Sequence, residues 1–232
     1  MTIAEKEKKY VDIIEGHMAK GVEFFTSHGI LIDETVTIGA GTKILPGTIL
    51  KGNTKIGENC VIGPNSLLEN CTVESGAVIN ACQCYQSVIM EGAKIGPFTQ
   101  IRPDCVIGKG AKIGDFVEVK NSNIGEGTAI AHLTYIGDSD VGRHVNFGCG
   151  VVTVNYDGEN KNRTTIGDYA FIGCNSNLIA PVKIGMGAYT AAGSTITKDV
   201  GDTDLAVARA RQENKIGWAK QKLAKYIEKH SR

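Results

Sequence analysis

The chain has 232 residues, with 25 basic and 25 acidic side chains and a formal net charge of zero. This balance excludes the strongly basic surface that nucleic-acid binding requires. No apolar run approaches the ~18 residues of a membrane-spanning helix, and the opening MTIAEKEKKY is charged where a signal peptide would be apolar. We therefore expect one cytoplasmic domain with no membrane partner and no nucleic-acid partner.

Residues 1–30 are expected to form an N-terminal capping helix and a lead-in. Apolar side chains recur there at helical spacing among lysines and glutamates, at Ile3, Tyr10, Ile14 and Met18. An amphipathic helix at this place would cover the first turn of the structure that follows, whose open edge would otherwise invite association.

Residues 31–200 keep one aliphatic residue at every sixth position. The first run is Ile32, Ile38, Ile44, Leu50, Ile56, Ile62 and Leu68; the register resumes from Ile95, slips by one near Ile124, Ile130 and Ile136, and returns from Ile166. Neither a helix (period 3.6) nor a strand (period 2) gives a step of six, so the unit is a short strand plus a turn. Three units make a triangular coil, and coils stack about 4.8 Å apart. We predict an all-β solenoid, a parallel β-helix of hexapeptide repeats with short α-helices at both ends; its class implies a left-handed β-helix.

Seven cysteines lie in the chain, at positions 60, 71, 82, 84, 105, 149 and 174. They form no CxxC pair, and most fall at small-residue positions of the repeat. We therefore expect buried free thiols rather than disulfides.

Arg102 and Lys120 lie eighteen residues apart, so they should stand above one another on one face. Two like charges at that spacing repel by about 1 kcal/mol in a solvent-like dielectric. An anionic ligand would reverse this, and a phosphate suits the guanidinium fork and the ammonium point charge. The pair predicts a phosphate site; the alternative is two solvated cations.

Polar side chains crowd the repeat between Ile113 and Tyr156, at Glu118, Lys120, His132, Tyr135, Asn146, Asn155 and Tyr156. His132 lies in a Gly- and Ala-rich stretch that leaves its ring little to pack against. Glu118 precedes it by roughly one coil as an orienting carboxylate. This arrangement predicts a general base with an acid beside it.

The repeat breaks at 154–165, where NYDGENKNRT forms a loop around the turn Asp157-Gly158. Such a loop should reach toward a neighbouring solenoid. Flat prism sides associate as trimers in this class, so we expect a homotrimer with ligand clefts between subunits. Residues 201–232 are a C-terminal segment with apolar residues at helical spacing from Gln212 onward, and we expect a helix that covers the far end of the solenoid.

Several longer runs go beyond a fold class: IRPDCVIGKGAKIGDFVEVKNSNIGEGT, AHLTYIGDSDVGRHVN, NYDGENK, NLIAPVKIGMGAYTAAGSTIT and LAVAR. They closely resemble the acetyltransferase domain of the bacterial bifunctional N-acetylglucosamine-1-phosphate uridylyltransferase/glucosamine-1-phosphate N-acetyltransferase, over roughly residues 5 to 218. The resemblance implies acetyl-CoA-dependent N-acetylation of glucosamine-1-phosphate, a step of UDP-N-acetylglucosamine and cell-wall biosynthesis. The family's uridylyltransferase domain has no counterpart in this sequence, so no uridylyl transfer is expected.

Carried over residue by residue, the resemblance makes His132 the general base and Glu118 the carboxylate beside it. It implies an amino-sugar phosphate site at Arg102, Lys120, Tyr135, Asn146 and Lys161. It implies an acetyl-CoA side at Cys149, Asn155, Tyr156, Cys174, Ala192 and Arg209. The family usually has Ala and Ser where this chain has Cys149 and Cys174.

No Ser or Cys lies in an evident nucleophile–base pair, so direct transfer to the amine is expected. The N–H groups of Gly148 and Gly150 are candidate oxyanion donors. A metal site of the carbonic-anhydrase type needs three histidines, and the middle region offers only His132 and His144; no metal is expected. The remaining alternatives are an acyltransferase for another amino sugar and a non-catalytic binding solenoid.

Overall fold

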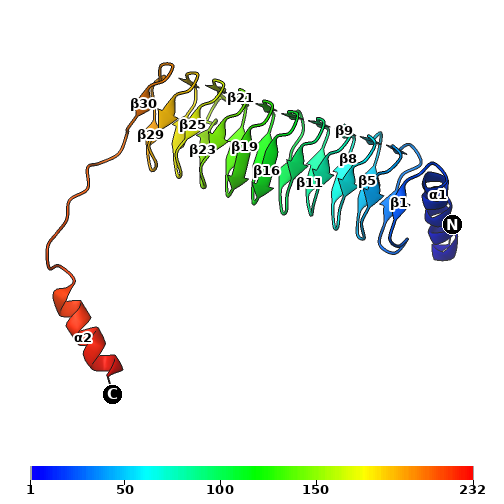
Figure 1. Ribbon diagram of the computed structural model, residues 1–232, viewed down its shortest axis with the longest axis horizontal. Helices are drawn as coiled ribbons and strands as arrows, with labels where there is room; N and C mark the ends of the chain where they lie inside the picture. Colours follow the sequence, from blue (N-terminus) through cyan, green and yellow to red (C-terminus); the bar gives the residue numbers. More distant parts are fainter. Residues whose placement is uncertain (1, 232) are drawn as a thin grey trace.

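The protein is a three-sided parallel β-solenoid of about ten turns, with one helix near each end of the chain (Figure 1). The computed structural model describes residues 2–231. The prediction of a parallel β-helix built from hexapeptide repeats is confirmed.

The three faces of the solenoid are three parallel sheets, named here sheets A, B and C. Sheet A contains β1 (Glu23–Phe24), β4 (Lys43–Ile44), β7 (Val61–Ile62), β10 (Val78–Ile79), β13 (Lys94–Ile95), β16 (Lys112–Asp115), β19 (Ala129–His132), β22 (Asn146–Phe147), β25 (Phe171–Ile172), β28 (Tyr189–Thr190) and β30 (Leu205–Ala206). Sheet B contains β2 (Leu31–Ile32), β5 (Ile49–Lys51), β8 (Leu67–Glu69), β11 (Gln83–Tyr85), β14 (Gln100–Ile101), β17 (Glu118–Lys120), β20 (Tyr135–Gly137), β23 (Val152–Val154), β26 (Asn177–Ile179) and β29 (Thr195–Ile196). Sheet C contains β3 (Thr37–Ile38), β6 (Lys55–Ile56), β9 (Thr72–Val73), β12 (Val88–Ile89), β15 (Val106–Ile107), β18 (Asn123–Ile124), β21 (Ser139–Val141), β24 (Thr164–Ile166) and β27 (Val182–Ile184).

The chain turns from sheet A to sheet B at what we call the A–B corner, and from sheet B to sheet C at the B–C corner. The repeat's aliphatic residues point inward from every face and are fully buried, as at Ile62, Leu68 and Ile101. Buried hydroxyls at the corners bond to backbone of the next coil; Thr128 Oγ1, for example, donates to Gly142 O over 2.8 Å. The interior is therefore apolar, and the stacking satisfies most of its few polar atoms, although Thr164 Oγ1 is buried without a hydrogen-bond partner.

Coil length varies, from sixteen residues between Ile79 and Ile95 to eighteen in the next coil, and this decides which side chains stack. Ile95 pairs with Ile113, eighteen residues on, whereas Ile113 pairs with Ile130, seventeen residues on. The slip seen in the sequence near Ile124 is therefore a shorter coil.

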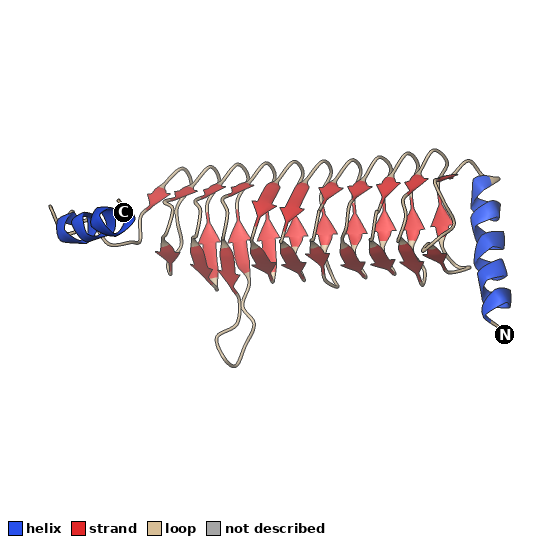
Figure 2. Cartoon of the chain, turned by 90° about the horizontal axis from the view of Figure 1, so that it is seen from below, coloured by secondary structure: helices blue, strands red, loops and turns tan. Residues whose placement is uncertain are grey.

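The predicted excursion lies between Val154 and Thr164 and projects from the side of the solenoid as the long loop of Figure 2. Tyr156 and Lys161 form an antiparallel bridge across it. Its return is anchored by Arg163, whose Nη2 and Nε donate to Asp140 over 2.7 and 2.9 Å. The loop is thus a small ordered hairpin.

The N-terminal helix, α1 (Ile3–Met18), covers the first coil as predicted (Figure 1). A capping box starts it: Glu5 N donates to Thr2 Oγ1 over 3.2 Å, and Thr2 N donates to Glu5 Oε2 over 2.6 Å. Ile14 and His17 are buried at the junction with the solenoid.

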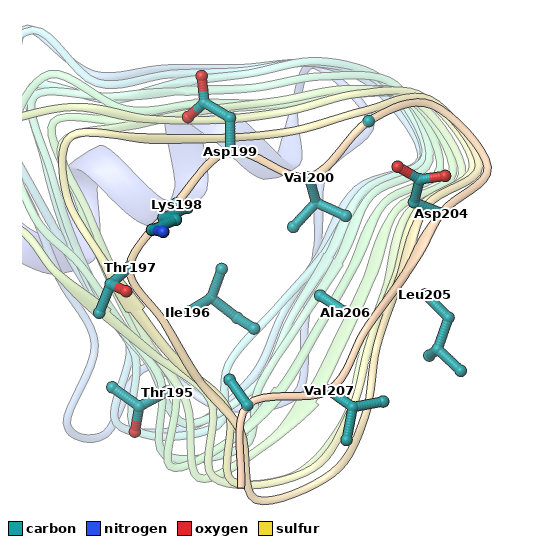
Figure 3. A pocket seen from close by; sticks show the side chains of 12 residues that line it. Thr195, Ile196, Thr197, Lys198, Asp199, Val200, Asp204, Leu205, Ala206 and Val207 are labelled. Atoms are coloured by element: carbon teal, nitrogen blue, oxygen red, sulfur yellow. The ribbon is translucent and has the colours of Figure 1, made fainter.

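The C-terminal helix, α2 (Lys220–His230), does not cover the other end, so this part of the prediction is wrong. The chain leaves β30 as an extended arm, and every residue of α2 is exposed (Figure 1). A cavity of about 430 Å³ consequently lies at the last coil, with Ile196, Val200 and Ala206 turned into it (Figure 3). The apolar side chains of α2 are exposed, so the helix does not bury the apolar surface that would hold it against the last coil.

Candidate active site

His132 ends β19 at the A–B corner, and its ring faces a carboxylate in the preceding coil. Asp115 ends β16 and pairs with His132 in register. His132 Nδ1 lies 2.7 Å from Asp115 Oδ1, and the two side chains are 59% and 38% exposed. The hydrogen bond from His132 lowers the pKa of Asp115. An ionised carboxylate only accepts, so Nδ1 carries the proton and Nε2 of the neutral ring is left as an acceptor.

The orienting carboxylate is therefore Asp115, and the expected pairing of Glu118 with His132 is corrected. Glu118 pairs in register with Tyr135, beyond the corner on sheet B. Its Oε1 accepts from Arg102 Nη1 over 2.9 Å. Residue 118 precedes residue 132 by only fourteen positions, which is less than one coil, so it lies beyond the corner; the coil of seventeen residues brings residue 115 alongside residue 132.

The structure brings Arg102 and Lys120 together on sheet B beside the B–C corner, as the eighteen-residue spacing predicts. Arg102 N donates to Val119 O over 2.8 Å, which fixes the register of the two coils. The pKa of Arg102 is raised, first by its hydrogen bond to Glu118. The pKa of Lys120 is lowered, first by its close neighbour Lys161 and then by burial. Three cations of one chain thus gather on this part of the sheet face.

Tyr135 lies beside this cationic cluster, which consists of Arg102, Lys120 and Lys161. Gly137 has no side chain, and a Cβ there would lie 2.4 Å from Tyr135 Oη. The ring therefore lies over Gly137, toward the B–C corner. Its hydroxyl adds a hydrogen-bonding group to the cluster.

Asp138, like Asp115, is a residue of this region that the sequence pattern did not indicate. It is 3% exposed, and its N–H donates to Lys120 O over 3.0 Å. Asn121 Nδ2 donates to Asp138 Oδ1 over 2.5 Å, and Asn155 Nδ2 donates to Oδ2. Burial acts to raise the pKa of Asp138, but the two amides and then Lys120 and Lys161 outweigh it, and the pKa is lowered. The signal that could have indicated Asp138 in the sequence is its place eighteen residues after Lys120, at about the length of one coil.

Asn155 and Tyr156, both expected on the acetyl-CoA side, differ in availability. Asn155 is only 8% exposed and its amide is held by Asp138. Tyr156 is exposed in the hairpin loop, where its hydroxyl donates to Gly158 O over 2.6 Å. Of the two, Tyr156 is the side chain that faces solvent.

The other expected coenzyme-side residues follow His132 along the A–B corner. Cys149, Cys174 and Ala192 occupy the matching position of the next three coils. Arg209 lies beyond β30, and a Cβ at Gly193 would lie 3.9 Å from Arg209 Cδ. The position that matches His132 therefore carries a small side chain in each of the next three coils, and the guanidinium-bearing side chain of Arg209 lies beside the last of these coils.

Three further residues expected in the site, Asn146, Gly148 and Gly150, differ from what the sequence predicts. Asn146 is exposed on the outer face of sheet A, across the corner from Tyr135. The candidate oxyanion donors are already used: Gly148 N donates to Ile172 O over 2.7 Å, and Gly150 N donates to His132 O over 3.3 Å.

His144 lies at the remaining corner, where its ring stacks on Tyr169 at 5.5 Å between centroids. Within residues 2–231 no group of three or more His, Cys, Asp or Glu side chains is arranged to hold a metal ion. None of the helices in that range is long and apolar enough to cross a membrane.

Three segments of the chain, residues 35–69, 86–121 and 163–198, match the family described as bacterial transferase hexapeptide (six repeats). The stacked coils of the fold are the structure that these repeats form. The chain is also 54% identical over 213 residues to the bifunctional protein GlmU of Caldanaerobacter subterraneus, covering 92% of this chain and 47% of that protein. It is 51% identical over 211 residues to GlmU of Thermodesulfovibrio yellowstonii, covering 90% and 47%. The chain thus spans about half the length of the curated relatives it matches, and it is homologous to that part of the GlmU proteins, as the resemblance in its sequence indicated.

Among solved structures, a mutant of the perosamine N-acetyltransferase of Caulobacter crescentus, in complex with CoA and GDP-perosamine, is similar at 21% identity. The match covers 54% of this chain and 59% of that one, with a TM-score of 0.46. The UDP-N-acetylglucosamine acyltransferase of Campylobacter jejuni matches at 19% identity over 86% of this chain and 77% of that one, also with a TM-score of 0.46.

Proposed function

We propose that the protein is an acetyl-CoA-dependent N-acetyltransferase that acts on an amino-sugar phosphate, with glucosamine-1-phosphate as the favoured acceptor. The observation that carries the proposal is the His132–Asp115 pair, which holds the ring of an exposed side chain through Nδ1, so that Nε2 is the nitrogen available to a substrate. A protonated amine cannot attack a thioester, so the reaction needs a base that takes a proton from the amine. The homology to GlmU proteins supports the same reaction class.

In this mechanism Nε2 of His132 takes one proton from the sugar amine as the nitrogen attacks the acetyl carbonyl. The carbon–sulfur bond then breaks, the imidazolium gives its Nε2 proton to the leaving sulfur, the coenzyme leaves as a thiol, and the amide product remains. Asp115 stabilises the imidazolium that forms at His132 and keeps the proton of Nδ1 in place. Asp115 acts through the histidine and is a positioning residue.

The cationic cluster is proposed to bind the phosphate of the sugar. Arg102 presents a planar fork and the two lysines present point charges, which together suit a phosphate dianion. Phosphate binding would relieve the repulsion that lowers the pKa of Lys120. This relief favours a phosphorylated sugar over a neutral one.

The small-residue corner above His132 is proposed to hold the acetyl-CoA arm. Cys149, Cys174 and Ala192 leave room along three coils, a rise of about 14 Å at the ordinary spacing of strands. Arg209 at the far end is placed to meet the coenzyme's phosphates. Asn146 and Tyr156 remain proposed contacts of sugar and coenzyme respectively, from neighbouring faces.

We further propose that the site is completed in a homotrimer. The base lies at the A–B corner and the cationic cluster lies toward the B–C corner, so a cleft between two solenoids would enclose what one solenoid leaves open. Phe98 and Phe116 support this arrangement, because they stack at 5.5 Å on the A–B corner while 62% and 57% exposed. A closed ring of head-to-tail contacts would cover such an apolar edge.

The test is thiol release from acetyl-CoA with glucosamine-1-phosphate, compared with other amino sugars and with unphosphorylated glucosamine. The His132→Asn variant should lose turnover, and the matched His144→Asn variant, at another corner, should keep it. Release with a different amino sugar only would change the acceptor. No release with any of them would favour a binding solenoid. A monomer mass by light scattering at micromolar concentration would remove the proposed cleft.

A further inference from the structure

Two thiols stand side by side on the A–B corner. β22 and β25 pair residue for residue, and continuing that register brings Cys149 opposite Cys174 in the next coil. Asn175 N donates to Cys149 O over 2.8 Å, which holds the two corners together. A Cβ at Gly148 would lie 2.8 Å from Cys174 Sγ, so this thiol lies over the corner of the coil before it.

These two thiols differ from the other five in their access to solvent. Cys174 is exposed and Cys149 is half-buried, whereas Cys60, Cys71, Cys82, Cys84 and Cys105 are buried in the core. Burial raises the pKa of each of the five core thiols. Because the thiolate is the reactive form, the core thiols are inert and chemistry is confined to the surface pair.

We propose that Cys149 and Cys174 are a dithiol site that closes to a reversible disulfide by exchange with a low-molecular-weight disulfide, in particular the oxidised form of the coenzyme. Residues aligned on adjacent coils have Cα atoms about 4.8 Å apart, inside the range of about 4.4–6.8 Å found for disulfides.

The exchange proceeds in two balanced steps. The thiolate of Cys174, the exposed sulfur, attacks the small disulfide, forms a mixed disulfide and releases one small thiol. The thiolate of Cys149 then attacks Cys174 Sγ, which forms the intrachain bond and releases the second small thiol. The two cysteines are oxidised, the small disulfide is reduced to two thiols, and the two thiol protons pass to solvent or to those products.

The position of the bridge gives it a consequence for the site. Cys149 occupies the coil that follows His132 at the same corner. A disulfide there would fix two residues of the strip proposed for the acetyl-CoA arm. We therefore expect the oxidised protein to lose at least about tenfold in turnover and to regain it with dithiothreitol; this effect and the preference for coenzyme A disulfide over cystine rest on the proposed function, whereas formation of the disulfide does not.

The experiment incubates the folded full chain with coenzyme A disulfide, removes the reagent, and counts free thiols in denaturant. The reduced protein should show all seven thiols and the oxidised protein five. Peptide mass mapping should join the peptides of Cys149 and Cys174. Cystine in place of coenzyme A disulfide tests whether the coenzyme portion matters; slower closure with cystine is expected.

Two variants make the result specific. Cys149→Ala should stop at a mixed disulfide on Cys174, with the mass of one coenzyme A added. Cys174→Ser should show neither the bridge nor a stable adduct. Seven thiols after incubation of the original chain, a bridge between two chains on a non-reducing gel, or loss of a core thiol instead would each overturn the proposal, whether or not the protein acetylates sugars.

Discussion

Replacing Asp138 with asparagine should destabilise the protein, because this buried carboxylate fixes two amides and balances two lysines. It accepts from Asn121 and from Asn155, on opposite oxygens. The variant amide keeps one accepting oxygen, but its NH₂ group then faces a donor. A hydrogen bond to a charged group contributes about 1.5–3 kcal/mol, so losing one should lower the free energy of unfolding by about 2 kcal/mol.

For a chain of this length, about 2 kcal/mol corresponds to a fall of about 4–8 °C in Tm. Thermal unfolding followed by circular dichroism or calorimetry measures it. Asp140→Asn is the matched control: its ion pair with Arg163 is exposed at 44% and 41% of the side chains, so the change should be smaller. The reasoning is refuted if the two variants unfold at the same temperature.

The same carboxylate gives a pH dependence of known sign. Its pKa in the folded protein is lowered from an ordinary value of 3.8. A group with a depressed folded pKa binds more protons in the unfolded chain, so its contribution is fully present above that ordinary value and is lost as the pH falls below it. The original protein should lose more stability than the Asp138→Asn variant between about pH 4 and lower values.

Four other outcomes are expected. His132→Ala should lower kcat by roughly 10²- to 10⁴-fold with little change in coenzyme affinity, while Asp115→Asn should cost less and shift the acidic limb of the kcat profile; equal losses would make Asp115 more than a positioning residue. Arg102→Ala should raise KM for glucosamine-1-phosphate by ~10-fold or more, and a KM unchanged by it would leave the cluster a solvated surface. His17 is buried with Nδ1 unpartnered and its pKa lowered by burial and then by Lys20, so stability is expected to be full above about pH 6.5 and to decline below it, and His17→Leu should abolish that decline in pH-dependent melting. With UTP, magnesium and N-acetylglucosamine-1-phosphate this polypeptide should release no pyrophosphate above a no-enzyme control.

The sequence by itself determined the architecture, because a step of six with a buried aliphatic residue at each step has one economical solution, the stacked triangular coil. It also brought Arg102 over Lys120, since residues one coil apart share a face. The excursion near 154–165 and the amphipathic helix at the start followed from interruptions of the same pattern. All of these are local or periodic features, which sequence spacing records directly.

Only the tertiary structure decided which carboxylate faces His132. The coil between them is seventeen residues long, which brings Asp115 to the ring, while Glu118 lies beyond the corner and pairs with Arg102 on sheet B. It also decided that α2 stands away from the last coil, because the amphipathic pattern of a helix shows that it has an apolar face and does not show what that face contacts. The carboxylate of Asp138 and the neighbouring thiols of Cys149 and Cys174 belong to the same group of features. Each depends on which residues of separate coils come into register. That register follows from the lengths of the coils, which are defined only once the solenoid has folded.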